Sequence, residues 1–294
     1  MGNRVMLFLA TNIALMALVS VVMSVLGAVF GIETDGVIGL IILSAVIGMG
    51  GSFASLAMSK WIAKRATGAH VIEQPRNDAE KWLVETTHRL ADEAGIGRPE
   101  VAIYDSPDLN AFATGAKRDN ALVAVSTGLV QSMRPNEVEA VLAHEVSHIA
   151  NGDMVTLTLI QGVLNAAVFF IARVLGQIID RNVFGNRDGG RGFGYYGIVI
   201  ALQIALGFLA SMVVMSFSRR REYRADAGGA SLTSNEDMAQ ALERLRGGVA
   251  PNARTQLPEQ VSAMGIRGSS PTGIRALLMS HPPIDDRIAA LRAG

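Results

Sequence analysis

Long stretches without a charged residue are the feature that most constrains how this chain can fold. A helix that crosses the roughly 30 Å hydrocarbon core of a bilayer needs about 20 apolar residues, and uncharged runs of about 18 or more are candidates. Such runs occupy residues 5–30, 37–59, 154–172 and 192–217. Their length disfavours buried helices of a soluble protein, and the first run exceeds the apolar region of a secretory signal. We therefore predict a mainly α membrane protein with four transmembrane helices, at about residues 5–30, 37–59, 154–179 and 192–217.

The predicted spans pair into two hairpins, residues 1–59 and 154–217, which alternate with polar segments at residues 60–153 and 218–294. Basic residues indicate the orientation of the spans because they concentrate in the cytoplasmic loops of membrane proteins. The first connecting loop has no basic residue and the second is mixed in charge. The basic residues that flank the spans on the other side are Arg4, Lys60, Lys64, Arg65, Arg219, Arg220, Arg221 and Arg224. We therefore expect both termini and both polar segments in the cytoplasm.

The composition narrows the function further. Charged residues make up 18% of the chain, against roughly 25% in an average soluble domain. The 26 basic residues balance the 26 acidic ones, and this balance argues against a nucleic-acid partner, which requires a basic surplus to neutralise phosphates. The chain has no cysteine. Any metal ion must therefore be held by histidine and carboxylate side chains.

The two polar segments alternate helix and strand patterns, and neither is large enough to bury a core alone. One helix is expected to begin at Asn77 or Asp78, and a second to begin at Pro135 and end at Asn151-Gly152. The strands predicted between them lie at residues 101–104, 110–114 and 121–125, with the last two forming a hairpin. We therefore predict one small α+β cytosolic domain, interrupted by the second membrane hairpin. Residues 247–271, rich in Gly, Pro, Ser and Asn, are expected to form a loop.

The helix that begins at Pro135 carries two histidines, in the sequence His144-Glu145-Val146-Ser147-His148. A spacing of four residues puts both imidazoles on one helix face, where two nitrogens can reach one Zn²⁺ at about 2.0 Å. Glu145 is offset by one residue, so it can lie beside the metal without ligating it and handle the protons of the attacking water. The motif indicates a zinc hydrolase, and two ordinary surface histidines are the alternative.

A catalytic zinc site needs a third protein ligand. The histidine candidates are His70, His88 and His281. Glu222 and Asp226 share a helix face just after the last span, so one could ligate zinc while the other binds the free ring nitrogen of a ligating histidine. A carboxylate pair among four arginines is also typical of a solvated salt-bridge surface. Spacing alone therefore leaves the third ligand open.

The order of these elements resembles a known family. The H-E-x-x-H helix between two membrane hairpins, the E-x-x-x-D helix after the last span and the C-terminal H-P-P-x-x-x-R are similar to those of the bacterial heat-shock membrane proteases. These proteases belong to the zinc metallopeptidases that also include the CAAX prenyl endopeptidases. The resemblance covers essentially the whole chain and implies a zincin-like (gluzincin) domain with one Zn²⁺, held by His144, His148 and Glu222. It also implies that Asp226 orients a zinc-binding histidine, with His144 as the expected partner.

The same resemblance assigns roles to two further segments. It implies that His281 and Arg287 lie near the metal as candidates for stabilising the oxyanion; the alternative is a histidine in a proline-rich turn and a surface arginine. Residues Asn110-Ala111-Phe112-Ala113 resemble the edge strand on which such peptidases bind an extended peptide by backbone hydrogen bonds. The alternative is an ordinary strand whose first residue is polar and has no role in substrate binding.

These observations predict a zinc endopeptidase embedded in the bacterial inner membrane, with its active site facing the cytoplasm. The resemblance implies a quality-control and stress-response role, in which cytosolic parts of misfolded or damaged membrane proteins are cleaved. A zinc-binding scaffold or regulator without turnover is the main alternative, and the intact Glu145 favours the enzyme. A transporter is disfavoured because Arg173 is the one ionisable residue close to being inside a span. The oligomeric state and the cleavage preference stay open.

Overall fold

The computed structural model describes residues 37–185, 193–247 and 279–293. The predicted first span, at residues 5–30, lies outside them, as does almost all of the predicted loop at 247–271. The chain divides into two compact units. The first unit consists of the residues up to Phe53 together with Leu159–Ala210. The second unit consists of Ala54–Thr158 and Ser211–Gly294.

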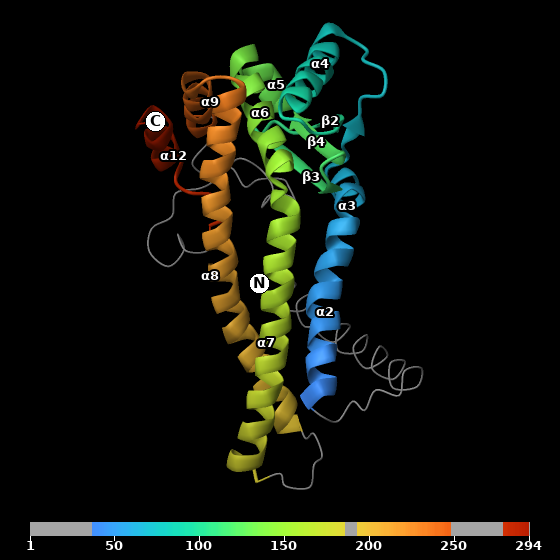
Figure 1. The fold of residues 1–294 in the computed structure, drawn as a ribbon, viewed down its shortest axis with the longest axis vertical. Coiled ribbons are helices and arrows are strands. Elements are labelled where there is room, and N and C mark those ends of the chain that lie inside the picture. Colours follow the sequence, from blue (N-terminus) through green and yellow to red (C-terminus); the bar gives the residue numbers. More distant parts are fainter. Residues whose placement is uncertain (1–36, 186–192, 248–278, 294) are drawn as a thin grey trace. The chain divides into compact units, whose positions relative to one another are not determined.

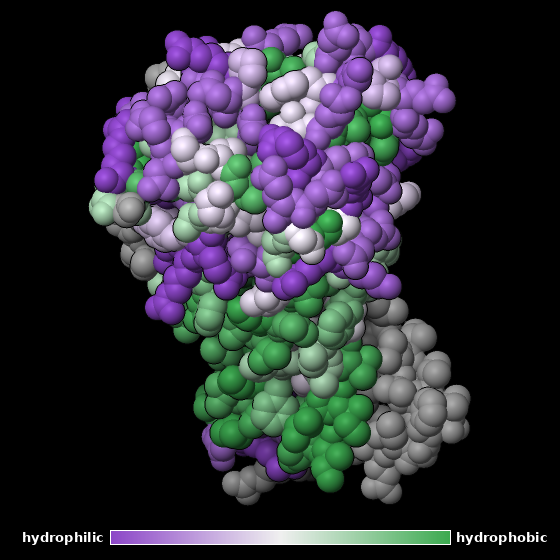
Figure 2. All heavy atoms as spheres, turned by 45° about the horizontal axis from the view of Figure 1, so that its top comes forward, coloured by the Kyte–Doolittle hydropathy of each residue, from purple (hydrophilic) through white to green (hydrophobic). Residues whose placement is uncertain are grey.

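Three long helices supply the first unit: α2 (Val37–Ala57), α7 (Asp153–Val183) and α8 (Phe193–Leu232). Among the described residues, these are the helices long and apolar enough to cross a membrane. Few of their apolar residues are buried in the protein, and their surface is almost continuously hydrophobic (Figure 2). Small residues allow close approach, because a Cβ on Gly48 would lie 2.3 Å from the backbone nitrogen of Ala166. Such packing is typical of helices in lipid.

The second unit contains a mixed four-stranded sheet with the strand order β1-β2-β4-β3. The strands are β1 (His70–Val71), β2 (Glu100–Tyr104), β3 (Ala111–Lys117) and β4 (Asn120–Ser126). β3 and β4 form the predicted hairpin, and β4 pairs in parallel with β2. The order leaves β3 at one edge of the sheet, with β4 as its one partner strand among the described residues.

Helices lie on both faces of this sheet, α3 (Ser59–Thr67) on one and α4 (Asp78–Glu93) and α6 (Pro135–Asn151) on the other (Figure 1). The other helices of this unit are α5 (Thr127–Ser132), α9 (Asn235–Gly247) and α12 (Ile284–Ala293). The larger core extends from one sheet face through α4 and α6 to α9 and α12. A smaller core on the other face includes Ala63 from α3. α6 therefore runs through the interior, and twelve of its residues are buried.

Local sequence sets the ends of α6. Pro135 occupies its first turn, where a missing N–H costs nothing. The side chain of Glu137 accepts a hydrogen bond of 2.7 Å from the backbone N–H of Arg134. Gly152 ends the helix with φ +67°, a left-handed conformation that favours glycine. This turn leads directly into Asp153, the first residue of α7.

The fold is thus mainly helical with a small mixed sheet, as predicted. Two details differ from the expectation. α8 continues as one helix beyond the uncharged run that ends at Phe217, so the residues after the predicted span lie on the same helix as the span. The helices α3, α5, α9 and α12 and the strand β1 were not predicted. β1 has two residues, too few for an alternating pattern to be recognised.

Candidate metal centre

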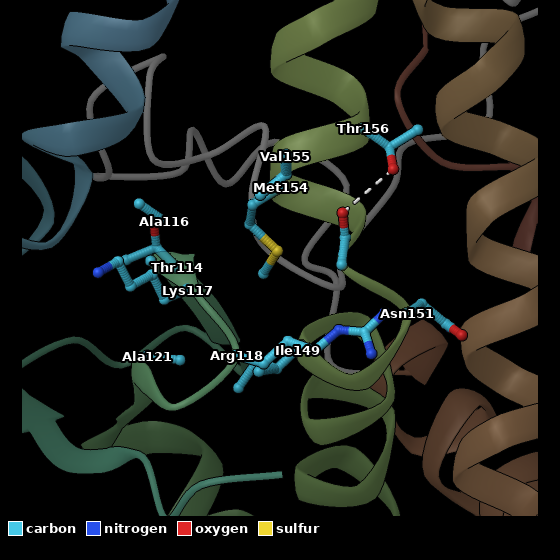
Figure 3. A pocket seen from close by; sticks show the side chains of 12 residues that line it. Thr114, Ala116, Lys117, Arg118, Ala121, Ile149, Asn151, Met154, Val155 and Thr156 are labelled. Atoms are coloured by element: carbon cyan, nitrogen blue, oxygen red, sulfur yellow. Dashed lines mark hydrogen bonds between the residues drawn. The ribbon is translucent and has the colours of Figure 1, made fainter.

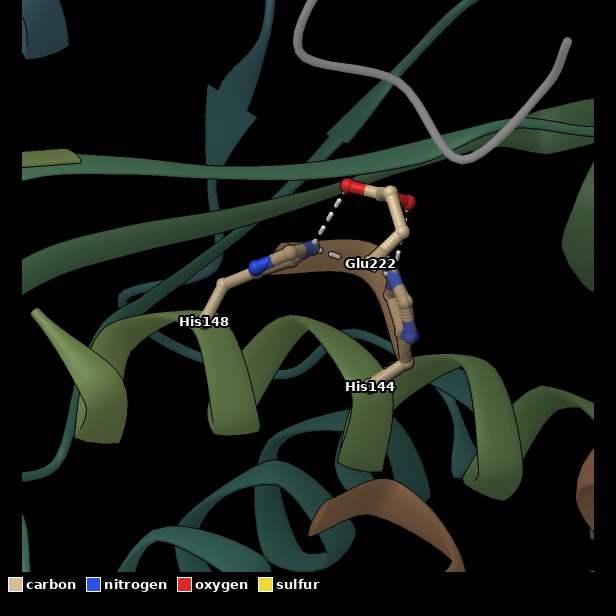
Figure 4. Close-up of side chains that lie close together, drawn as sticks. All are labelled: His144, His148 and Glu222. Carbon is tan, nitrogen blue, oxygen red and sulfur yellow. Dashed lines mark hydrogen bonds and ion pairs between the residues drawn. The ribbon is translucent and has the colours of Figure 1, made fainter. Parts of the chain in front are cut away.

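The two histidines of α6 point to one place in the interior of the second unit. His144 is fully buried and His148 nearly so, and their rings lie edge to face with the Nε2 atoms 3.1 Å apart (Figure 4). The opposite face of α6 carries Val138, Leu142 and Val146, which belong to the main core. The core packing of one face therefore holds the imidazoles on the other.

Glu222 on α8 completes the cluster. Its Oε1 lies 3.3 Å from Nε2 of His148, and its Oε2 lies 3.6 Å from Nε2 of His144. In the described part of the chain these three residues are the set whose donor atoms could hold one metal ion. Two donors about 2.0 to 2.1 Å from a tetrahedral ion lie roughly 3.3 Å apart, so the observed separations fit such an ion. The buried carboxylate and two imidazoles therefore match the donor chemistry of a metal centre.

Each of the two histidines contacts a second carboxylate through its other ring nitrogen. Oδ1 of Asp226 lies 3.0 Å from Nδ1 of His144, which is the arrangement expected from the i, i+4 spacing with Glu222. Oδ2 of Asp153 lies 2.7 Å from Nδ1 of His148. Carboxylates at this position fix the orientation of a ligating imidazole and raise its basicity.

Asp153 was missed by the sequence argument, which used it only as the boundary of a span. It is fully buried, and its Oδ1 also accepts a hydrogen bond of 2.5 Å from Nη2 of Arg224. The signal was present: an acidic residue follows His148 by five positions, just past a helix-ending Asn151-Gly152. A left-handed turn at Gly152 changes the direction of the chain, so the carboxylate of Asp153 lies next to His148.

The C-terminal segment brings His281 and Arg287 to the same cluster. Nδ1 of His281 lies 2.7 Å from Oε2 of Glu222, and Nε2 of His281 is buried with no hydrogen-bond partner among the described residues. Arg287, fully buried on α12, donates two hydrogen bonds of 2.8 and 2.6 Å to Asp226. Its Nη1 lies 3.5 Å from Oε2 of Glu222. Arg287 is therefore not a surface arginine.

Burial and charge act in opposite directions on the carboxylates. Burial raises the pKa of Glu145 above its usual value. Burial also acts to raise the pKa of Glu222, but electrostatic interactions with His281 and His148 and hydrogen bonds from His144 and His148 hold it well below its usual value. For Asp226, the effect of burial is outweighed by the charge and hydrogen bonds of Arg287, and the pKa is about 2. Glu145 is thus the carboxylate of the cluster best suited to take up a proton.

Two glycines bring α8 against α6 beside the cluster. A Cβ on Gly228 would lie 2.0 Å from Oγ of Ser147, and one on Gly229 would lie 3.0 Å from the backbone nitrogen of His144. Side chains at either position would separate the two helices. The close approach delivers Glu222 and Asp226 to the histidines.

The residues at the start of β3 lie near Glu145 of α6. The hydroxyl of Tyr104 donates a hydrogen bond of 3.4 Å to the backbone oxygen of Asn110. The pKa of Tyr104 is raised, mainly by burial, and the charge of nearby Glu145 contributes. Asn110 is buried, and its Oδ1 has no hydrogen-bond partner among the described residues. Ala111, Phe112 and Ala113 follow as the first residues of the edge strand.

The fold and the site together are those of a protein with long apolar helices and a buried candidate metal centre. The sequence profile of peptidase family M48 matches residues 77–294, and the chain belongs to that family. Family membership implies a metal ion, which the buried His144, His148 and Glu222 fit. The three apolar helices indicate membrane embedding. The protein is a membrane metalloprotease.

Related proteins are similar in sequence over essentially the full chain. Protease HtpX of Xanthomonas campestris pv. campestris (strain 8004) is 58% identical over 294 residues, covering 100% of this chain and 98% of that protein. Protease HtpX of Alkalilimnicola ehrlichii is 57% identical over 299 residues, covering 99% and 98%. The crystal structure of S. mikatae Ste24p shares the fold, with a TM-score of 0.64 and 19% identity. That likeness covers 96% of this chain, which spans 64% of the Ste24p chain.

Proposed function

We propose that this protein is a zinc endopeptidase of the bacterial cytoplasmic membrane, with both termini and the active site in the cytoplasm. Its proposed substrates are cytosolic parts of misfolded or damaged membrane proteins, as part of quality control and the stress response. The observation that carries the proposal is the buried cluster of His144, His148 and Glu222 with Glu145 beside it. The absence of cysteine and the all-imidazole and carboxylate donor set suit Zn²⁺ in a hydrolytic site.

The residues divide the work of peptide hydrolysis. His144, His148 and Glu222 would hold one Zn²⁺, which supplies Lewis acidity that makes water a nucleophile near neutral pH. Glu145 takes a proton from the attacking water and later delivers it to the leaving amine. The raised pKa of its buried carboxyl favours the first transfer. Asp226 and Asp153 hold the two imidazoles in orientation.

We assign substrate binding to the edge strand. The backbone of Ala111, Phe112 and Ala113 would pair with an extended peptide, which gives affinity with little sequence preference. Asn110 would add a side-chain contact, since its Oδ1 has no hydrogen-bond partner in the described structure. The unpaired Nε2 of His281 supports a role as donor to the oxyanion. Arg287 is assigned to the same oxyanion, with its Nη1 beside Glu222 and the rest of its guanidinium on Asp226.

Replacement of one carboxylate by an amide tests the mechanism. Wild type and Glu145→Gln are purified in detergent, loaded with zinc to the same content, and incubated with casein and with a membrane protein. We expect a loss of activity of about 10² to 10⁴, because proton transfer is lost while the ligands remain. Equal cleavage by both would refute the role of Glu145. No cleavage by zinc-replete wild type would favour a zinc-binding scaffold.

A second variant tests the ligand set and the metal. Glu222→Ala removes one of three donors, so zinc content measured by mass spectrometry should fall far below one per chain. Arg224→Ala, two residues away on α8 and more than half exposed, serves as the control and should keep its zinc. Full occupancy in Glu222→Ala would contradict the assignment. A reporter fused after Gly294 that is active only outside the cytoplasm would overturn the orientation.

A further inference from the structure

A cavity of about 340 Å³ lies between the tip of the β3–β4 hairpin and the junction of α6 with α7, within the second unit. One wall is formed by the end of β3, including Thr114 and Lys117, and by Arg118 in the turn that follows it (Figure 3). The other is formed by Ile149, at the end of α6, and by the first turn of α7. Its size suits an amino-acid side chain with part of its backbone.

The charged residues that line this cavity are all basic. Lys117 and Arg118 are its two charged lining residues, and both are exposed. Neither forms an ion pair with another described residue, and no acidic side chain lines the cavity. Two free cations are complementary to a carboxylate.

A bulge in β3 shapes the wall that carries these residues. The pairing of β3 with β4 shifts between Thr114 and Lys117, and Gly115 within the shift has φ +147°. Bulges of this kind change the direction of the side chains that follow them. The hairpin tip is anchored by Asp119, whose Oδ1 accepts a hydrogen bond of 3.0 Å from the backbone N–H of Gly97. The two basic residues therefore sit on a fixed element.

The cavity lies along the path assigned to the substrate. The Asn110 end of β3 is near Glu145, and the Lys117 end lines the cavity. A peptide added antiparallel to β3, the slightly more stable pairing, has its N-terminal part at the Lys117 end. The part of the cavity wall that follows Glu145 along α6 begins at Ile149, four residues later, and ends at Gly152, seven residues later. At about 1.5 Å per helical residue this is roughly 6 to 10 Å, or two to three residues of an extended peptide at about 3.3 Å each.

We propose that this cavity is a substrate subsite that selects an acidic side chain, Asp or Glu, two or three residues before the cleaved bond. Lys117 and Arg118 bind its carboxylate. The inference rests on the proposed endopeptidase function and on the assignment of β3 as the strand that binds substrate. It adds a sequence preference to an interaction that backbone pairing alone would leave nonspecific.

The test compares matched peptides. Cleavage sites of the zinc-loaded wild type in casein are mapped by mass spectrometry, and a peptide around one site is made with Glu, Gln or Lys at the second or third position before the cut. We expect kcat/KM to be about fivefold higher for Glu than for Gln at one of these positions, an effect typical of exposed charge pairs, and to be lowest for Lys. The preference should weaken at high salt.

Variants connect this preference to the cavity. In the double variant Lys117→Gln with Arg118→Gln, the ratio of kcat/KM for the Glu peptide to kcat/KM for the Gln peptide should fall to about one. Lys81→Gln, an exposed lysine on α4, is the control and should keep the ratio. The Glu145→Gln protein should show the same preference in peptide affinity, measured by fluorescence anisotropy, independently of turnover.

A ratio of one in wild type, or a ratio unchanged in the double variant, would overturn the proposal. If the double variant instead loses binding to vesicles that contain an anionic phospholipid while the peptide ratio is unchanged, the cavity is a lipid headgroup site and the proposal is wrong. Failure of wild type to cleave casein would contradict the endopeptidase function itself. The affinity measurement on Glu145→Gln would still decide the peptide preference.

Discussion

Helices α7 and α8 each run through both units of the chain, and their side chains have opposite surroundings in the two. In the unit with the long apolar helices, Ile204 of α8 is 53% exposed. Of the residues in the most apolar stretch of α8, only 11% are buried in the protein. In the catalytic unit, Glu222 and Asp226 of the same helix are almost completely buried. One helix therefore presents its apolar residues outward and its charged residues inward.

The difference shows which forces hold each unit. Lipid is as apolar as isoleucine, so helices in a membrane associate through close contact of small residues such as Gly48. In the catalytic unit a buried charge would be very costly alone, and each carboxylate is paired with a histidine or an arginine. Four substitutions can break or sharpen this contrast, and each has a matched partner elsewhere.

The largest effect is expected from Arg287→Ala. It leaves the buried carboxylate of Asp226 without its two hydrogen bonds, which should lower the free energy of unfolding by about 3 to 5 kcal/mol. Arg292→Ala on the same helix removes a half-exposed ion pair with Glu243 and should cost less than about 1 kcal/mol. Denaturant unfolding in detergent measures both. Equal losses would show that burial of the pair adds nothing.

The next effect comes from truncating one large apolar side chain in each unit. Leu142→Ala on α6 leaves a cavity in the main core and should cost about 2 to 5 kcal/mol. Ile204→Ala on α8 removes an outward-facing side chain and should change stability by less than about 0.5 kcal/mol. Thermal unfolding of the two variants provides the comparison. A large loss for Ile204→Ala would mean that this face packs against protein.

Asp153→Ala should lower metal affinity by about tenfold to a hundredfold, because His148 loses the carboxylate that orients it. The affinity is measured by competition with a chromophoric chelator. Arg224→Ala, which removes the other contact of Asp153, should have a much smaller effect because Arg224 is 57% exposed. An unchanged affinity in Asp153→Ala would show that His148 is held by packing alone.

The smallest effect distinguishes two glycines of α8. Gly229→Ala forces a methyl group against the backbone of His144 and should cost about 1 to 2 kcal/mol, with a drop in metal affinity. Gly197→Ala meets nothing within 4 Å and should stabilise the helix by about 0.5 to 1 kcal/mol. Stability and zinc content are measured on both. Similar behaviour would contradict the close packing of α8 on α6.

Sequence reasoning succeeded where a pattern is local. The two histidines of α6 share one helix, so their spacing alone predicts that they meet. The apolar runs that begin at residues 37, 154 and 192 predict long helices by length, and α2, α7 and α8 follow them. The run at residues 5–30 lies outside the described residues and stays a prediction.

Sequence reasoning failed where the geometry depends on distant residues. Glu222 lies 78 positions after His144, and no spacing rule relates them, so only the resemblance selected it as a ligand. The contact of Arg287 with Asp226 depends on how α12 packs, which no local pattern encodes. Asp153 was missed for a different reason: the turn at Gly152 was read as the end of a helix and not as a change of direction.

The wide separation of the cluster's members along the chain has a consequence for synthesis. A ribosome delivers His144 and His148 well before Glu222, and His281 and Arg287 come last, at the end of the chain. Proteins are made at about 5 to 20 residues per second, so the nascent chain carries half of the centre for several seconds or more. During that interval the two imidazoles lack the contact with Glu222. The cluster is therefore complete only after α8 and α12 have been synthesised and have packed against α6.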